Sequence, residues 1–83
     1  MTRHRAGINI ITVTADQFRK VLHGRKPFTI HLMSGRQFRV PHTDYAALSM
    51  SENCIVFTDD QDNLEMIRLP AIESITIEEQ PAA

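Results

Sequence analysis

Apolar and polar residues alternate along the middle of the chain, and this alternation is the strongest structural signal in the sequence. Every second residue is apolar in Phe28–Leu32, and the same period returns in Phe38–Val40. Ser34 and Gly35 lie between the two runs. Two runs of period two around a glycine-containing turn predict a β-hairpin.

The register of this hairpin follows from the side chains that must be buried together. Ile30 shares a face with Phe38 or Val40 only if the loop has an odd number of residues, because a slip of one residue moves every side chain to the other face. A three-residue loop with a type I turn and a G1 bulge meets this condition and places Gly35 in the left-handed region. We therefore expect Gly35 to serve the turn, because a Cβ atom is disfavoured at positive φ.

A short amphipathic helix is predicted before the hairpin. Thr14 and Gln17 have the spacing of a capping box, in which two residues satisfy free N–H groups at the start of a helix. Gly24 is expected to end the helix as its C-cap. Apolar residues recur at helical spacing at Phe18, Val21 and Leu22. Such a short helix needs to pack this stripe against the following sheet.

Short runs with strand character follow the hairpin. They are Ala46–Met50, Cys54–Thr58, Leu64–Leu69 and a last strand that contains Ile75 and Ile77. One helix followed by short antiparallel strands predicts a mainly β fold, namely an SH3-like five-stranded bent antiparallel barrel with one short N-terminal α-helix. Residues 14–78 are expected to form this unit. Residues 1–13 are expected to be a basic tail and an apolar extended segment that covers the barrel or pairs with a neighbour, and residues 79–83 an acidic tail.

Length and composition are those of a small globular domain. The 83 residues are enough for one domain, and domains of this size often gain stability by forming oligomers. No apolar run has the length of a membrane span and the first residues lack the layout of a signal peptide, so a cytoplasmic location is expected. The single cysteine, Cys54, lies in an apolar run and is expected to be a small buried hydrophobe.

The charges are divided unevenly between the two halves of the chain. Residues 1–41 hold eight of the nine Lys and Arg residues and one of the ten Asp and Glu residues, while residues 42–83 hold one basic and nine acidic residues. Such a division favours nucleic acid on one surface or head-to-tail contact between subunits. The alternative is that folding interleaves the two halves into a mixed surface, and the sequence leaves both open.

Two segments carry a resemblance to a known family. Ile30–Phe38 is similar to the hydrophobic-x-Leu-x-x-Gly-x-x-hydrophobic core of the first Sm motif, and Ile67–Ile72 is similar to the Ile-Arg-Gly-x-x-Ile of the second. Over roughly Thr14–Ile77 the chain thus resembles the Sm-like (LSm/Hfq-type) small barrel proteins. The resemblance implies closed rings, in which the last two strands of neighbouring subunits pair, and binding of RNA uridines or adenines.

Several positions of the family motifs hold other residue types in this chain. Val40 stands where the family has the glycine that bends the second strand. Leu69 and Pro70 replace the Gly-Asn of the second motif, which leaves Arg68 as the retained base-contacting position. The run Val40–Tyr45 also resembles a Val-x-His-x-Asp/Glu-aromatic pattern of short bacterial proteins, and this pattern implies no function.

No set of residues in the sequence has the arrangement of a catalytic or metal site. The four histidines lack metal-ligand spacing, and His42 is expected to form a local turn hydrogen bond with Asp44 rather than a catalytic pair. The acidic run Asp59–Asn63 lacks the glycine and the distal glutamate of a calcium loop and is expected to be a solvated turn. We therefore expect a non-enzymatic protein that needs no cofactor and no metal.

Weak or non-specific RNA binding through a basic surface of the helix and hairpin is the first functional hypothesis. Basic side chains hold phosphates, whereas bases stack on exposed aromatic groups. The four phenylalanines fit core positions, which leaves Tyr45 as the exposed aromatic candidate. The candidate nucleic-acid-binding residues are Arg19, Lys20, Arg25, Lys26, Arg36, Arg39, Arg68, Tyr45 and His31.

The second hypothesis is a homo-oligomeric protein–protein interaction or scaffold module with no nucleic-acid ligand. Edge strands with apolar side chains tend to pair with another chain, and opposite charges on the two halves would orient such contacts. The candidate interface residues are Leu64, Met66, Ile67, Leu69, Ile75 and Ile77. The sequence leaves the ligand, the ring size and the biological process open.

Overall fold

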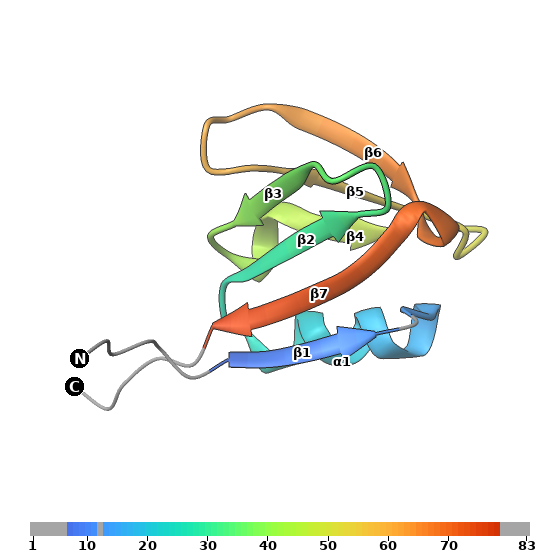
Figure 1. Cartoon of the computed structure of the whole chain (residues 1–83), viewed down its shortest axis with the longest axis horizontal. Coiled ribbons are helices and arrows are strands. Elements are labelled where there is room, and N and C mark those ends of the chain that lie inside the picture. Colours follow the sequence, from blue (N-terminus) through green and yellow to red (C-terminus); the bar gives the residue numbers. More distant parts are fainter. Residues whose placement is uncertain (1–6, 12, 79–83) are drawn as a thin grey trace.

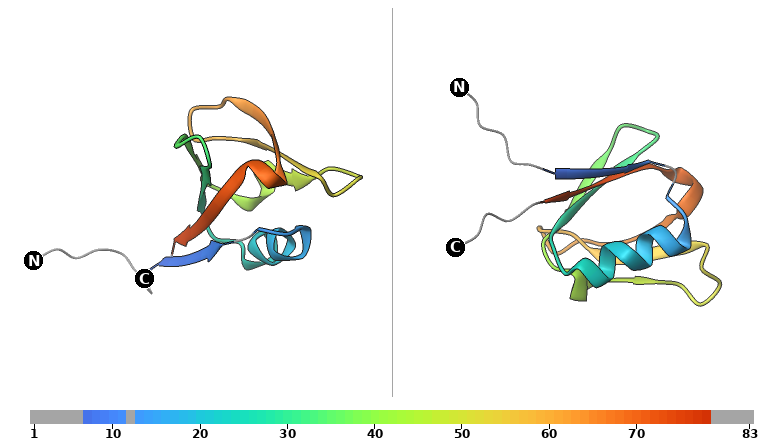
Figure 2. Two further views of the ribbon diagram at one scale, coloured as in Figure 1. Left: turned by 45° about the vertical axis from the view of Figure 1, so that its right-hand side comes forward. Right: turned by 90° about the horizontal axis from the view of Figure 1, so that it is seen from below.

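The computed structural model describes residues 7–11 and 13–78 of the chain. They form seven strands in two antiparallel sheets, together with one α-helix and two 3-10 turns (Figures 1 and 2). In chain order the elements are β1 (Gly7–Ile11), α1 (Ala15–Gly24), β2 (Phe28–Leu32), β3 (Gln37–Val40), η1 (Thr43–Tyr45), β4 (Ala46–Leu48), β5 (Cys54–Thr58), β6 (Leu64–Arg68), η2 (Leu69–Ala71) and β7 (Ile72–Glu78). The first sheet has the order β1-β7-β2-β3 and the second the order β4-β5-β6.

The prediction of a mainly β chain with one short helix is confirmed, but the number and connection of the strands differ from the prediction. The described residues form seven strands rather than five, and hydrogen bonds join them into two sheets rather than one closed barrel. Six of the strands correspond to the runs with strand character in the sequence, and the seventh is β1, which the sequence suggested only as an extended segment. Pro41 and η1 interrupt the chain after β3, so β3 and β4 belong to different sheets, as expected of a residue that cannot donate to a ladder.

The β2–β3 hairpin has the predicted register, with Ile30 opposite Phe38. Its loop lies between Leu32 and Arg36, because the Leu32 N–H donates to the Arg36 carbonyl at 2.9 Å. The Gly35 N–H donates to the Leu32 carbonyl, also at 2.9 Å, and Gly35 has a φ of 95°. These bonds and this angle confirm the three-residue loop with a G1 bulge.

The helix α1 begins as predicted and ends one residue later than predicted. The Thr14 hydroxyl accepts a hydrogen bond from the Gln17 N–H at 3.1 Å, so Thr14 is the N-cap. Gly24 is still helical, and the left-handed cap residue is Arg25, with a φ of 58°. The Arg25 N–H donates to the Leu22 carbonyl at 3.3 Å and so closes the last turn without a glycine.

The core lies between the two sheets, and α1 covers it on one side. Figure 2 shows the helix crossing the space between β1 and the second sheet, and α1 contacts β4 and η1. Phe18 of α1 packs edge-on against Phe28 of β2, and Phe38 of β3 does the same against Phe57 of β5. All four phenylalanines are buried, as predicted. The other buried apolar residues are Val21, Ile30, Leu32, Val40, Ile55, Ile67, Leu69, Ile72 and Ile75.

The strand β1 covers the outer edge of β7. Gly7–Ile11 pairs antiparallel with Ser74–Glu78, so that β7 lies between β1 and β2. The predicted extended segment therefore pairs within its own chain. The basic tail and the acidic tail that the sequence suggested fall on residues 1–6 and 79–83, outside the described residues. Within residues 7–11 and 13–78 no helix is long and apolar enough to cross a membrane.

Candidate functional site

The outer face of the four-stranded sheet is polar, and its side chains bond to one another. One register row crosses all four strands from Asn9 through Thr76 and Thr29 to Arg39. The Thr76 hydroxyl donates to the Asn9 amide oxygen at 2.9 Å and lies 3.0 Å from His31 Nε2. Because the hydroxyl proton is directed to Asn9, Thr76 accepts a hydrogen bond from the His31 Nε2–H. We call this surface the polar face.

Arg39 on the polar face is held by a carboxylate of the same sheet. Its Nε lies 2.7 Å from one Glu78 oxygen and its Nη2 lies 3.0 Å from the other. The hydrogen bond that Arg39 donates to Glu78 raises the pKa of Arg39 above its ordinary value. The pair of guanidinium and carboxylate has no net charge, so it attracts a phosphate less strongly than an unpaired guanidinium does.

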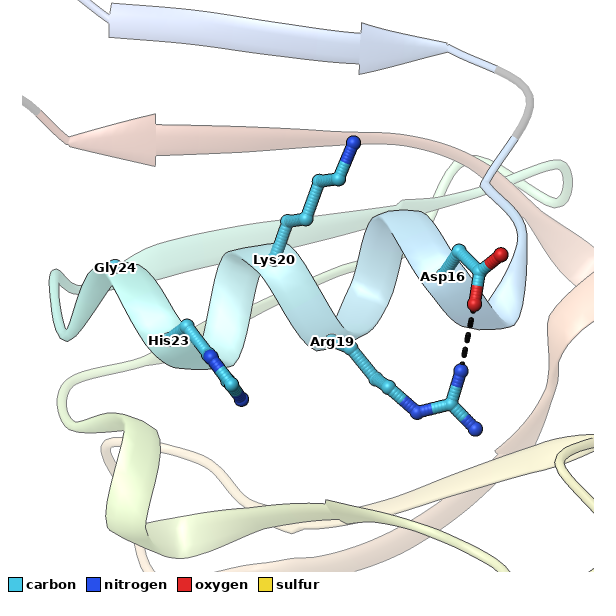
Figure 3. Close-up of a pocket in the computed structure, with 5 residues that line it drawn as sticks. All are labelled: Asp16, Arg19, Lys20, His23 and Gly24. Carbon is cyan, nitrogen blue, oxygen red and sulfur yellow. Dashed lines mark hydrogen bonds and ion pairs between the residues drawn. The ribbon is translucent and has the colours of Figure 1, made fainter.

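Basic side chains of α1 line an open hollow of about 580 Å³ on the exposed side of the helix (Figure 3). The Arg19 guanidinium donates to Asp16 at 2.7 Å and also forms an ion pair with Glu52. Figure 3 shows Lys20 pointing to the opposite side of the helix from Arg19 and His23. We call this surface the helix face, and its lining residues are Asp16, Arg19, Lys20, His23 and Gly24.

The predicted basic residues do not form one surface. His31 and Arg39 lie on the polar face, whereas Arg19 and Lys20 lie on the helix face. Arg36 is placed over the ring of Phe38, with its guanidinium carbon 4.9 Å from the ring centroid. The remaining predicted residues are Arg25 at the helix cap, Lys26 in the following turn, Arg68 at the end of β6 and Tyr45 in η1.

In the folded structure, ion pairs join some basic residues of the first half of the chain to acidic residues of the second half. The Arg19–Glu52 and Arg39–Glu78 ion pairs each join a basic residue of the first half to an acidic residue of the second. These contacts agree with the interleaved surface that the sequence left open as an alternative. As a result, two of the predicted phosphate-binding groups, Arg19 and Arg39, are already paired with carboxylates of the same chain.

The two polar turns are structural, as predicted. The Asp44 N–H donates to His42 Nδ1 at 3.1 Å, which caps η1. Asp59 accepts hydrogen bonds from the N–H groups of Gln61 and Asn63 at 3.0 and 2.9 Å, and these bonds, the one from Asn63 first, lower the pKa of Asp59. In the part of the chain that the structure describes, no group of three or more His, Cys, Asp or Glu residues is placed to hold a metal ion.

The outer face of the second sheet is mostly apolar. Ala47, Val56 and Met66 form one register row across β4, β5 and β6. Met66 is 69% exposed, Leu64 is 71% exposed and Tyr45 is 53% exposed. An open hollow of about 340 Å³ lies over the same sheet. We call this surface the apolar face, and its hollow is lined by Asp44, Tyr45, Ala46, Ala47, Val56, Phe57, Thr58 and Leu64.

The candidate interface residues are divided between this face and the core. The side chains of Ile67, Leu69 and Ile75 are buried in the chain itself, so they are not available to a partner. Leu64 and Met66 are exposed, and Ile77 packs against the core while half-buried. Of the β6 residues predicted to form an interface, Leu64 and Met66 face outward and Ile67 belongs to the core. The interface itself stays a prediction.

Some residues of the apolar face were missed by sequence reasoning. Ala47 and Val56 were not among the candidates, although Cys54–Thr58 has apolar residues at both odd and even positions. That pattern indicates a strand with two apolar faces. Cys54 was predicted to be buried, but it is half-buried and lies opposite Arg68 in the β5–β6 ladder.

The fold and its surfaces define a small, mainly β protein with one polar and one apolar sheet face. A scan against protein-family models finds no match for this chain, and searches of the curated proteins and of the solved structures find no significant match.

Proposed function

We propose that this protein is a non-enzymatic protein-interaction module that binds an extended polypeptide along the apolar face and the free edge of β6. The observation that carries this proposal is the position of Leu64 and Met66. Both large apolar side chains are about 70% exposed, and both lie on a strand that, among residues 7–11 and 13–78, has a neighbour on one side only. Figure 1 shows β6 at the outer margin of the molecule.

The backbone of β6 supports binding of an extended chain. The Leu69 N–H donates to the Asn53 carbonyl at 2.8 Å and the Asp59 N–H donates to the Asn63 carbonyl at 3.0 Å, at the two ends of the β5–β6 ladder. Hydrogen-bonded pairs alternate along an antiparallel ladder. The same alternation leaves the N–H and C=O groups of three β6 residues directed away from β5, namely Leu64, Met66 and Arg68.

The side chains of the apolar face supply the second part of such a site. An added strand receives its affinity from main-chain hydrogen bonds and its specificity from alternate side chains. The row of Ala47, Val56 and Met66 lies directly beside the free edge, and Tyr45 lines the adjacent hollow. An exposed apolar surface next to an unpaired strand edge is typical of an interaction site.

The same proposal includes an SH3-like barrel of the Sm-like kind as the architecture. Support comes from the path of the chain. The hairpin β2–β3 is followed by the meander β4-β5-β6, and β7 returns to pair with β2, so that the first and last strands of the unit are neighbours. The corner that the family forms with a glycine is formed here after Val40 by Pro41 and η1.

Peptide display tests the proposed function directly. A library of random heptapeptides would be selected on the immobilised protein and counter-selected on a Leu64→Lys/Met66→Lys double variant. We expect enriched peptides with alternating apolar residues that bind the natural protein and lose at least about tenfold in affinity on the variant, because two apolar anchors are removed. Selected peptides that bind both proteins equally would contradict the proposal.

RNA binding is the second candidate, favoured by Lys20 and His23, which line the hollow on the helix face beside the paired Arg19. Fluorescence anisotropy with uridine-rich and adenine-rich oligonucleotides at physiological salt would test it. A dissociation constant below about 10⁻⁶ M would mean that the protein binds RNA more tightly than is usual for non-specific binding. If such binding is lost in a Lys20→Glu/His23→Glu variant, the helix face is a nucleic-acid site, and the apolar face is not the main binding surface.

A further inference from the structure

We propose that the occupant of the β6 edge is a second copy of this chain, whose β6 pairs antiparallel with the first across a two-fold axis at Met66. This inference rests on the proposed function, because it takes the free edge of β6 as the binding surface. It goes further by naming the partner, the strand and the register. The result is a closed dimer in which two three-stranded sheets become one six-stranded sheet.

The free backbone groups of β6 are complementary to themselves. With Met66 opposite Met66 of the second copy, Leu64 lies opposite Arg68 of that copy, and Arg68 lies opposite its Leu64. Each of these residues directs its N–H and C=O toward the free edge, so every outward group meets an outward group. In a two-fold antiparallel pair, opposite residues point to the same face. The apolar faces of the two copies therefore lie on the same side of the joined sheet.

The side chains of this face then form one continuous row. Ala47, Val56 and Met66 already lie side by side across three strands. The two-fold axis adds the same three residues of the second copy in reverse order, so that apolar side chains cross all strands of the joined sheet without a charged interruption. Met66, now 69% exposed, is covered by its counterpart, which accounts for a methionine in the middle of an exposed strand.

The charges at the two ends of β6 favour this antiparallel arrangement. Arg68 is the only Lys or Arg in residues 42–83 and ends β6, whereas the acidic turn Asp59–Asn63 precedes its first residue. Antiparallel pairing places Arg68 of one copy opposite Leu64 of the other, at the end of β6 that follows the acidic turn. The contact occurs twice because of the symmetry. A parallel arrangement would instead place like charges together at both ends.

The first sheet does not offer the partner strand that a ring of the Sm-like kind would use. The outer edge of β7 is paired with β1 along Gly7–Ile11. A head-to-tail contact between β6 and β7 of a neighbour would therefore require β1 to leave its sheet. Pairing of β6 with itself requires no change in the chain.

Sedimentation velocity over a concentration series tests the assembly. We expect a monomer–dimer equilibrium for the natural chain, and we expect Met66→Lys to raise the dimer dissociation constant about tenfold or more, because like charges would face each other at the axis. Met50→Lys is the matched control, since Met50 is 99% exposed and lies outside the strands. Equal weakening by both substitutions, or a natural chain that stays monomeric to millimolar concentration, would overturn the inference.

Cross-linking tests the register. In a Cys54→Ser background, Met66→Cys should give a covalent dimer with a short bis-maleimide at low protein concentration, whereas Met50→Cys should not. An oligomer that forms without a Met66→Cys cross-link would overturn the two-fold pairing and indicate pairing of β6 with another edge, such as β1. Concentration-dependent protection of the Leu64, Met66 and Arg68 amides from hydrogen exchange, measured on the natural chain, gives the same answer without a substitution.

The two proposals fail on different results. If the natural chain is monomeric but display peptides still bind the apolar face, the inference of a second copy is wrong and the interaction module stands. If the chain dimerises with the cross-link at Met66 but no peptide discriminates the double variant, the edge of β6 is already occupied by the second copy. In that case the inference stands, and the proposed binding of other polypeptides is wrong.

Discussion

The two sheets of this protein have the same apolar inner face but opposite outer faces. In the four-stranded sheet the outward positions hold hydrogen-bonding side chains such as Thr29, His31 and Thr76. In the three-stranded sheet they hold Val56, Leu64 and Met66. The outer edge of β7 is covered by β1, whereas β6 has a strand neighbour on one side only in the part of the chain that the structure describes.

The difference shows which surface of the protein is available to bind a partner. On the polar face, Thr76 bonds to Asn9 and His31, and Arg39 is held by Glu78. Groups that already bond to one another gain little by exchanging these bonds for bonds to a ligand. The apolar face has exposed side chains and a free strand edge, so association removes apolar area from water and adds hydrogen bonds.

The largest expected effect concerns the contact that joins the two sheets. Phe38 of the first sheet meets Phe57 of the second with ring centroids 5.5 Å apart, and both rings are buried. We expect Phe38→Ala to lower the free energy of unfolding by about 3 to 5 kcal/mol, because it removes a large buried side chain and leaves a cavity. Denaturant unfolding followed by circular dichroism measures this loss.

The exposed Met50 supplies the control for that experiment, because Met50→Ala should change stability by less than about 0.5 kcal/mol. If Phe38→Ala lowered the free energy of unfolding no more than Met50→Ala, the two sheets would not share one core. They would then be independent units.

A smaller effect is expected on the polar face. Thr76→Val keeps the shape of the side chain but removes the hydroxyl that joins Asn9 and His31. We expect a loss of about 1 kcal/mol in the free energy of unfolding, the usual net contribution of such hydrogen bonds. Thr29→Val is the matched control, because Thr29 is adjacent on the same face and makes no side-chain hydrogen bond within residues 7–11 and 13–78. Equal results for both variants would show that the polar network contributes no stability.

The features predicted correctly from the sequence are those fixed by residues close together in the chain. The hairpin register and the position of Gly35 follow from a short alternating run. The start of α1 follows from Thr14 and Gln17. By contrast, the pairing of β1 with β7 joins Asn9 to Thr76, 67 residues apart. Local patterns show that such a segment is extended but do not show which strand it joins.

The binding surfaces were predicted only in part, because they too depend on contacts between distant parts of the chain. In Leu64–Leu69 both alternating sets contain apolar residues, so the sequence does not decide which set faces the core. The structure places Ile67 opposite Ile55 in the core and turns Leu64 and Met66 outward. The basic surface was over-predicted because Glu52 and Glu78, the partners of Arg19 and Arg39, lie 33 and 39 residues away in the chain.

The smallest expected effect concerns the turn at which the free edge begins. Asp59 accepts hydrogen bonds from the Gln61 and Asn63 N–H groups, and these bonds lower its pKa below the ordinary value of 3.8. A carboxylate with a lowered pKa in the folded state contributes stability above its unfolded pKa, and this contribution is lost as the pH falls through the folded pKa. We expect Asp59→Asn to lower the unfolding midpoint slightly at neutral pH and to match the natural chain in strong acid.

An NMR titration of the Asp59 carboxyl group measures the shift directly, and Asp60→Asn in the same turn is the control. A titration midpoint at or above 3.8 would contradict the hydrogen-bonded turn. The result also sharpens the contrast between the two sheets. If the acidic turn loosens in acid, the amides of β6 near Leu64 should exchange faster while those of β2 and β7 do not, because the turn adjoins β6 and bonds to β3, through the Asp60 N–H and the Arg39 carbonyl, rather than to β2 or β7.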